Sequence, residues 1–157
     1  MRCIDLLFPP RLAEAEILIV VPADPRTVKA KFILRTLKLT KKNDYTEVKI
    51  PGLAGTALQF VGANPRLLSM VFYFDERKTS IDVREGMKEI SDFMSVDRNV
   101  HAPPILLFQW KGFSFRCVLE SIAEEFISQF SDGRPSLAKM RVKFRESIEI
   151  SQLIEET

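Results

Sequence analysis

Alternating apolar and polar positions predict β-strands over most of the chain. The first clear signal is the β-branched run Glu16–Val21, which ends in the turn sequence PADP. In residues 26–40, Val28, Ala30 and Phe32 alternate with Lys29 and Lys31, and Leu37 and Leu39 flank Lys38. This period of two is typical of a half-buried strand. The two segments together predict a β-hairpin.

The middle of the chain predicts a loop, a turn and a central strand. Residues 41–45 (KKNDY) are expected to form a polar loop. Residues 46–60 contain a short strand, a Pro51-Gly52 turn and a second glycine, Gly55. Residues 66–76 are apolar at both alternating sets of positions, which predicts a central strand covered on both sides.

Residues 80–97 predict one helix. Val83, Met87, Ile90 and Met94 recur at i, i+4, i+7 and i+11, with Phe93 beside them. Asp82 can cap the first turn, and Glu85 has the position of a capping-box partner. Gly86 weakens the helix by about 1 kcal/mol relative to Ala. Packing of the apolar stripe is expected to outweigh that cost.

The part after the helix predicts an antiparallel meander. Its strand signals are residues 105–110, 113–122, 123–130 and 138–150. Lys111-Gly112 and Ser131–Arg134, which contains Gly133, have the composition of hairpin turns. The chain is therefore expected to be one mainly β domain with one helix inserted between strands.

Composition and charge narrow the function classes. The 157 residues suit one domain, and twelve Phe against one Trp and two Tyr indicate core packing. A formal net charge of +2, from 23 basic and 21 acidic side chains, gives no reason to expect nucleic-acid binding. Cys3 and Cys117 form no disulfide framework and suit a reducing compartment.

Membrane and secretion signals are also missing from the sequence pattern. No apolar stretch approaches the roughly 20 residues of a membrane span. The apolar patch Ile4–Phe8 is too short for the core of a signal peptide. We therefore expect a protein that is made in the cytoplasm and binds no membrane.

The segment NVHAPPILLFQW contains the only histidine, His101, and the strongest candidate for catalysis. No hydrolase, metalloprotease, phosphate-loop or dinucleotide-binding motif accompanies it, and one His with two distant Cys matches no metal-site spacing. We expect no enzyme activity, metal or cofactor. His101 is expected to hydrogen-bond to the backbone at a strand entry that Pro103 and Pro104 stiffen, and Trp110 ends that strand.

Three basic residues, Arg141, Lys143 and Arg145, lie on one side of the last strand. Such a stripe is most often a solvated strand face. Its functional alternative is one wall of a charged interface or channel.

Several segments in this order resemble the contractile injection system tube protein family, the tube initiators or baseplate hubs of phage-tail-like particles. The resembling features are IPGL at 50–53, LQF at 58–60, HAPP at 101–104 with the strand to Trp110, VLES at 118–121 and DGRP at 132–135. They cover about residues 14–150. Where members carry Phe-Asn-Pro, this chain has Phe32, Ile33 and Leu34, and the LysM module that often follows in the family is not seen.

The resemblance implies two packed antiparallel sheets in a phage tail-tube-like barrel or sandwich. Residues 15–150 would form this domain, with an N-terminal extension at 1–14 and a C-terminal tail at 151–157. Pro51, Gly52, His101, Pro103, Pro104, Trp110 and Gly133 are its expected structural or assembly residues, and Arg141, Lys143 and Arg145 its expected lumen or interface charges.

The resemblance also implies a structural role. A homohexameric ring would join a trimeric spike or hub protein to the inner tube protein and initiate tube growth, with baseplate wedge proteins as further partners. It would assemble in the cytoplasm and become part of a phage tail-like particle. The alternative from the residues is a β-barrel that binds a small ligand or polysaccharide, with Trp110 as a pocket wall.

Overall fold

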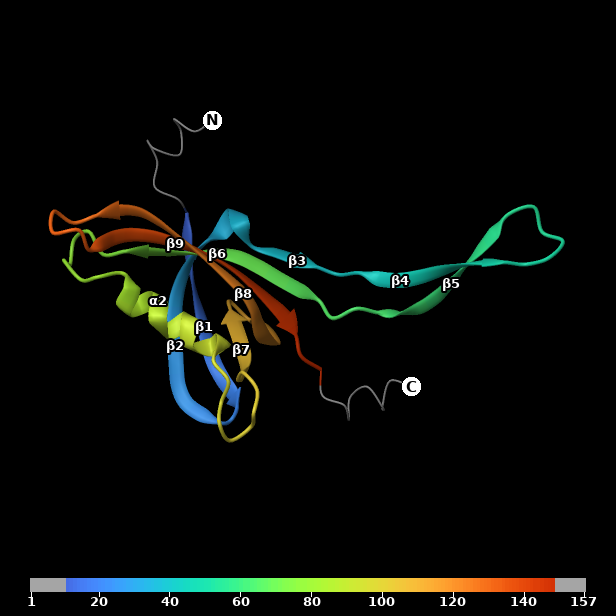
Figure 1. The fold of residues 1–157 in the computed structure, drawn as a ribbon, viewed down its shortest axis with the longest axis horizontal. Coiled ribbons are helices and arrows are strands. Elements are labelled where there is room, and N and C mark those ends of the chain that lie inside the picture. Colours follow the sequence, from blue (N-terminus) through green and yellow to red (C-terminus); the bar gives the residue numbers. More distant parts are fainter. Residues whose placement is uncertain (1–10, 149–157) are drawn as a thin grey trace, which may run out of the picture.

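The computed structural model describes residues 11–148 (Figure 1). Cys3, the Ile4–Phe8 patch and most of the expected terminal extensions lie outside the described residues, so the division into extension, domain and tail stays a prediction. The strands are β1 (Leu12–Val21), β2 (Asp24–Ile33), β3 (Lys38–Thr40), β4 (Asn43–Lys49), β5 (Thr56–Ala63), β6 (Leu67–Asp75), β7 (Ile105–Trp110), β8 (Phe113–Gln129) and β9 (Pro135–Glu146). Between β6 and β7 lie the helix α2 (Arg84–Ser91) and the 3-10 turn η2 (Asp92–Met94).

The first hairpin is confirmed, but it is shorter than expected. β1 pairs antiparallel with β2 from Leu12–Ile33 to Ile19–Asp24. After Ile33 the chain leaves β2 through a 3-10 turn, η1 (Leu34–Thr36), and β3 then pairs with β6. The Thr36 hydroxyl accepts a hydrogen bond from the Val71 N–H at 3.0 Å and so joins η1 to β6. The alternation at Leu37 and Leu39 therefore belongs to a different strand pair.

The C-terminal meander is confirmed, with one long strand in place of two. β8 runs for 17 residues and pairs antiparallel with β7 and β9, and β9 pairs with β6. Lys111 and Gly112 have φ values of 46° and 82°, which a two-residue hairpin turn with both φ angles positive requires. Gly133, with φ of 94°, closes the β8–β9 turn.

The seven-stranded sheet has the order β2-β1-β7-β8-β9-β6-β3 and curls over its own core. The pairing of β2, at one end, with β6, near the other, shows this curl, and the rings of Phe108 on β7 and Phe144 on β9 lie 5.9 Å apart inside it. β2 meets β6 only at the pair Phe32–Phe72, and the sheet is not a closed barrel. The prediction of a mainly β fold with one helix and two sheets is confirmed. The second sheet, β4-β5, is not the packed layer that we expected.

The helix has the expected stripe except at its end. Val83, Met87, Ile90 and Phe93 are buried in the core, whereas Met94 is 40% exposed, so its assignment to the stripe is wrong. The α-helix ends at Ser91 and tightens into η2, which turns Met94 away from the core and Phe93 into it. Asp82 accepts a hydrogen bond from the Arg84 N–H at 2.9 Å, just before the formal N-cap, Val83.

The hairpin β4–β5 projects from the body as a long arm (Figure 1). It begins at Asn43, so residues 43–45 are strand and the expected polar loop is reduced to two residues. A side-chain hydrogen bond of 3.2 Å from Asn64 to Asp44 ties the two strands together at the arm's base. The arm is the largest feature that the sequence pattern did not separate from the body.

Candidate assembly surfaces

One face of the arm is apolar and uncovered. Tyr45 lies opposite Phe60, with ring centroids 5.6 Å apart, and Leu58 follows on the same face opposite Glu47. Tyr45, Phe60 and Leu58 are 56%, 57% and 69% exposed. A two-stranded hairpin is marginally stable alone, and contiguous exposed apolar side chains usually mark an interaction site. The arm therefore has the properties of a surface that another protein covers.

The arm's tip is a tight turn at the predicted position. The Leu53 N–H donates to the Ile50 carbonyl at 3.2 Å, with Pro51 and Gly52 between them. Gly52 has φ of 90°, as a type II turn requires at its third residue. Ile50 and Leu53 are exposed on either side of this turn, so the tip carries apolar side chains of its own.

The sheet face that points away from the core carries the basic stripe. Arg141 and Lys143 are exposed on β9, and their neighbours across the sheet are small or apolar: Val71 and Ala123 flank Arg141, and Ser69 and Ser121 flank Lys143. We call this side of β3, β6, β9 and residues 118–129 of β8 the outer face. Arg145 is different, because it pairs with Glu120 at 2.8 Å.

A hollow of about 610 Å³ on the outer face brings four cations together. Arg35 and Lys38, from η1 and β3, join Arg141 and Lys143 around it. Sequence reasoning missed Arg35 and Lys38 because only the β3–β6–β9 order brings residues about 100 positions apart to one surface. We call the part lined by these four cations with Thr36, Ser69 and Ser121 the basic groove.

Two strand edges at opposite sides of the outer face lack a partner in the described part of the chain. β7 pairs with β8 only as far as Cys117, so residues 118–129 pair with β9 alone. On the other side, β3 pairs with β6 alone. Phe126 and Ile127 lie on the β8 edge and are 50% and 46% exposed. Exposed edges with apolar side chains are templates for pairing with another chain.

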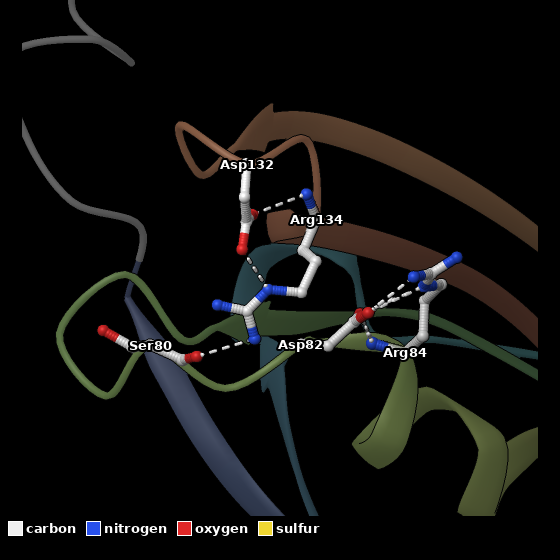
Figure 2. Close-up of polar contacts among 5 residues, drawn as sticks. All are labelled: Ser80, Asp82, Arg84, Asp132 and Arg134. Atoms are coloured by element: carbon white, nitrogen blue, oxygen red, sulfur yellow. Dashed lines mark hydrogen bonds and ion pairs between the residues drawn. The ribbon is translucent and has the colours of Figure 1, made fainter.

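The end of the sheet near α2 is built from repeated Asp-X-Arg turns. In each of residues 75–77, 82–84 and 132–134, the Asp carboxylate accepts the backbone N–H of the Arg two residues later and also binds its guanidinium. Figure 2 shows two of these turns and the bond of 3.1 Å from Arg134 Nη1 to the Ser80 carbonyl. The predicted turn residue Gly133 therefore lies inside this cluster.

Hydrogen bonds fix the charge state of these turns. The Arg77 and Arg84 guanidinium groups lower the pKa of Asp75 and Asp82, and the backbone and side chain of Arg134 lower the pKa of Asp132. These carboxylates therefore stay ionised to a lower pH than an ordinary aspartate. The repeated Asp-X-Arg pattern, which also occurs at 24–26, is visible in the sequence and could have identified these turns.

His101 lies in a tight loop between η2 and β7, at the joint between helix and sheet. Its backbone N–H donates to the Asp97 carbonyl at 2.8 Å, and its φ is 55°. The hydrogen bond thus comes from the backbone, whereas we expected it from the imidazole, which is exposed. Pro104 is buried and Pro103 half-buried, directly before β7. Their place at the strand entry agrees with the sequence, but their role in assembly stays a prediction.

Trp110 ends β7 and packs on Phe32, with ring centroids 5.7 Å apart and the rings nearly perpendicular. Its buried Nε1 has no hydrogen-bond partner among the described residues. The hollow beside it, of about 460 Å³, is lined mostly by charged and polar residues such as Glu14, Glu16 and Lys111. This lining does not match the mainly apolar pocket that a small-ligand site favours.

The described residues provide little for catalysis. Burial raises the pKa of the Cys117 thiol to about 12, which keeps it protonated and unreactive. Within residues 11–148, no three His, Cys, Asp or Glu side chains are grouped to hold a metal ion. The helices described there are also too short or too polar to span a membrane.

The predicted residues do not converge on one site. Arg141 and Lys143 share the basic groove, Pro51 and Gly52 form the arm's tip, Gly133 belongs to the Asp-X-Arg turns, and His101 with the two prolines lies at the helix–sheet joint. The molecule therefore presents several separate surfaces, as a protein with several contacts would.

Comparison with known proteins identifies the fold. The family model described as "Contractile injection system tube protein" matches residues 23–155. The Dit hub protein of phage SPP1, a phage of Gram-positive bacteria, is similar in structure with a TM-score of 0.52 and 10% identity over 85% of this chain, which spans about half (49%) of the Dit chain. A chain of the anti-feeding prophage baseplate has a TM-score of 0.48 and 9% identity, over 90% of this chain and 91% of that one. No curated protein matches in sequence.

Proposed function

Because this chain belongs to the contractile injection system tube protein family, and is therefore a structural component of a phage tail-like particle, we propose that it forms a ring that joins the spike to the inner tube and initiates tube assembly. The observation that carries the proposal is the pair of unpartnered edges on either side of the outer face. The ring would contain six copies and would assemble in the cytoplasm.

The strand directions support closure by edge pairing. The four-stranded part of the sheet, β8-β9-β6-β3, is antiparallel throughout, so its two edge strands run in opposite directions. A copy rotated about a ring axis would therefore place its β8 edge antiparallel to the β3 edge of its neighbour. Where the rotation between copies closes, such a head-to-tail contact forms a ring and covers the β8 and β3 edges.

The arm would supply the second contact. In a ring, its apolar face of Tyr45, Leu58 and Phe60 would pack on a neighbouring copy or on an adjoining component, which explains why it is uncovered in one chain. The outer face would then line the lumen. The inner tube protein and a trimeric spike protein are the proposed axial partners, with baseplate wedge proteins around them, and no catalytic step is needed.

Electron microscopy of the protein mixed with its inner tube and spike proteins tests this proposal. We expect rings on the wild type and short tubes that begin at those rings. The variant Leu58→Ser/Phe60→Ser should keep the wild-type melting temperature, because both side chains are more than half exposed, and should lose the rings and tubes.

The matched control is Thr46→Ala/Gln59→Ala, which changes the opposite face of the same arm. It should form rings like the wild type. A wild type that stays monomeric at high concentration and joins neither partner would contradict the proposal, as would rings of equal yield from both variants.

A further inference from the structure

The basic groove has a local excess of positive charge, although basic and acidic residues nearly balance over the whole chain. Among the described residues, its lining contains Arg35, Lys38, Arg141 and Lys143 and no carboxylate, although the whole sequence has 23 basic and 21 acidic residues. Ser69 and Ser121 add hydroxyl groups that can donate hydrogen bonds, whereas the Thr36 hydroxyl already donates to the Ile33 carbonyl. Cations with hydroxyl donors around one hollow are the groups that bind an anionic ligand.

Another pair of basic residues on a strand shows that the excess of positive charge is specific to the groove. Lys29 and Lys31 have the same spacing on β2, but their neighbours across the sheet are Glu16 and Glu14. Across from Arg141 and Lys143 lie only Val71, Ala123, Ser69 and Ser121. Among residues 11–148, neither Arg141 nor Lys143 forms an ion pair with a carboxylate. Their charge is therefore available to a partner.

The geometry of the groove favours an extended polypeptide. Arg141 and Lys143 are two residues apart on one strand, which places them about 6.8 Å apart along β9. Alternate side chains of an extended peptide have the same spacing, so two carboxylates at i and i+2 would meet both cations. The Arg141 guanidinium can bind a carboxylate through two parallel hydrogen bonds.

The lining argues against nucleic acid as the occupant. Within residues 11–148 it contains no aromatic side chain, whereas proteins that bind single strands stack bases on aromatic rings. We propose that the basic groove is a binding site for an acidic polypeptide segment of a partner protein, held in extended form by Arg141 and Lys143. This site lies within one chain, so it goes beyond the proposed function and does not depend on ring formation.

Fluorescence anisotropy with a labelled ten-residue oligoglutamate tests the inference at low salt. We expect saturable binding that weakens as salt rises. Arg141→Gln/Lys143→Gln should bind roughly tenfold more weakly, because the two cations that hold the extended segment are lost. The control Lys29→Gln/Lys31→Gln removes the same charge and should change binding less than about twofold. Circular dichroism checks that both variants are folded.

Three results would overturn the inference. They are no saturable binding by the wild type, equal weakening in the two variants, and tighter binding of a single-stranded oligonucleotide of equal charge than of oligoglutamate. The last result would assign the groove to nucleic acid. Because a single chain suffices for this experiment, failure here leaves the ring proposal standing, and failure of the ring leaves this result standing.

Discussion

The conformation of individual residues was easiest to predict where the backbone geometry of a turn alone determines which residue fits. Gly52, Gly112 and Gly133 all adopt the positive φ that their turn sequences indicate. Buried side chains such as Phe32 and Phe144 follow from strand alternation. The hydrogen bond of His101 comes from its backbone N–H and not from the imidazole. That difference was not predictable, because the direction of an imidazole in a loop depends on neighbours that local sequence does not specify.

Gly86 offers a stability test at this scale. A Cβ placed there would lie 3.6 Å from the Phe74 ring, an ordinary packing distance, and the position has helical geometry. Gly86→Ala should therefore raise the free energy of unfolding by up to about 1 kcal/mol, since it favours the helix. Thermal unfolding should show a rise of about 2–4 °C. A fall in the melting temperature would mean that the Phe74 side of the helix has no room.

Trp110 separates the structural interpretation from the ligand-binding one. Its ring packs on Phe32 and its Nε1 is buried without a partner among the described residues. Trp110→Phe should keep most of this packing and cost less than about 1.5 kcal/mol, whereas Trp110→Ala should cost about 3 kcal/mol. Urea unfolding measures both. A Trp110→Ala protein of wild-type stability would favour the pocket-wall role.

Helices and strands were predicted correctly where their contacts are local in sequence. Predictions failed where the contacts join distant segments. The β7-β8-β9 meander and α2 follow from turns and periodicity within about 20 residues. The arm could not be distinguished, because the alternation of Tyr45, Leu58 and Phe60 is the same whether a hairpin packs on the body or projects from it. The basic groove could not be predicted either, because it depends on the order of strands in the sheet, which no local sequence pattern contains.

An ion pair that holds the end of β9 predicts how stability depends on pH. Arg66 donates two side-chain hydrogen bonds, of 2.9 and 2.6 Å, to Glu146 Oε2, and its backbone N–H donates to Oε1 at 3.2 Å. These bonds lower the pKa of Glu146 from its ordinary value of 4.5. The folded state therefore gains stability from this group above about pH 4.5, and loses that gain as the pH falls through the folded-state pKa.

Glu146→Gln tests this pair. The variant should be about 1 kcal/mol less stable than the wild type at pH 7, because the charge-assisted bonds are weakened. The difference should shrink as the pH falls below 4.5 and through the lowered folded-state pKa of Glu146, where protonation removes the same charge from the wild type. Chemical denaturation across this range measures it. A difference that does not change with pH would show that the carboxylate charge does not contribute.

At the scale of the whole molecule, the separate surfaces have one common explanation. Three kinds of surface lack a partner among the described residues: the β8 and β3 edges, the apolar face of the arm, and the basic outer face. Ring formation would cover the two edges and the arm together. The curled sheet and its aromatic core supply a rigid body that holds these surfaces in fixed relation. The groove would then face the lumen, where an acidic segment could reach it.

A cryo-electron-microscopy reconstruction of the protein assembled with its inner tube protein tests the central claim most directly. We predict a six-fold ring in which residues 118–129 of one protomer pair with β3 of the next, and in which Arg141 and Lys143 face the lumen. A ring in which those edges stay exposed, or in which Arg141 and Lys143 face outward, would contradict the account.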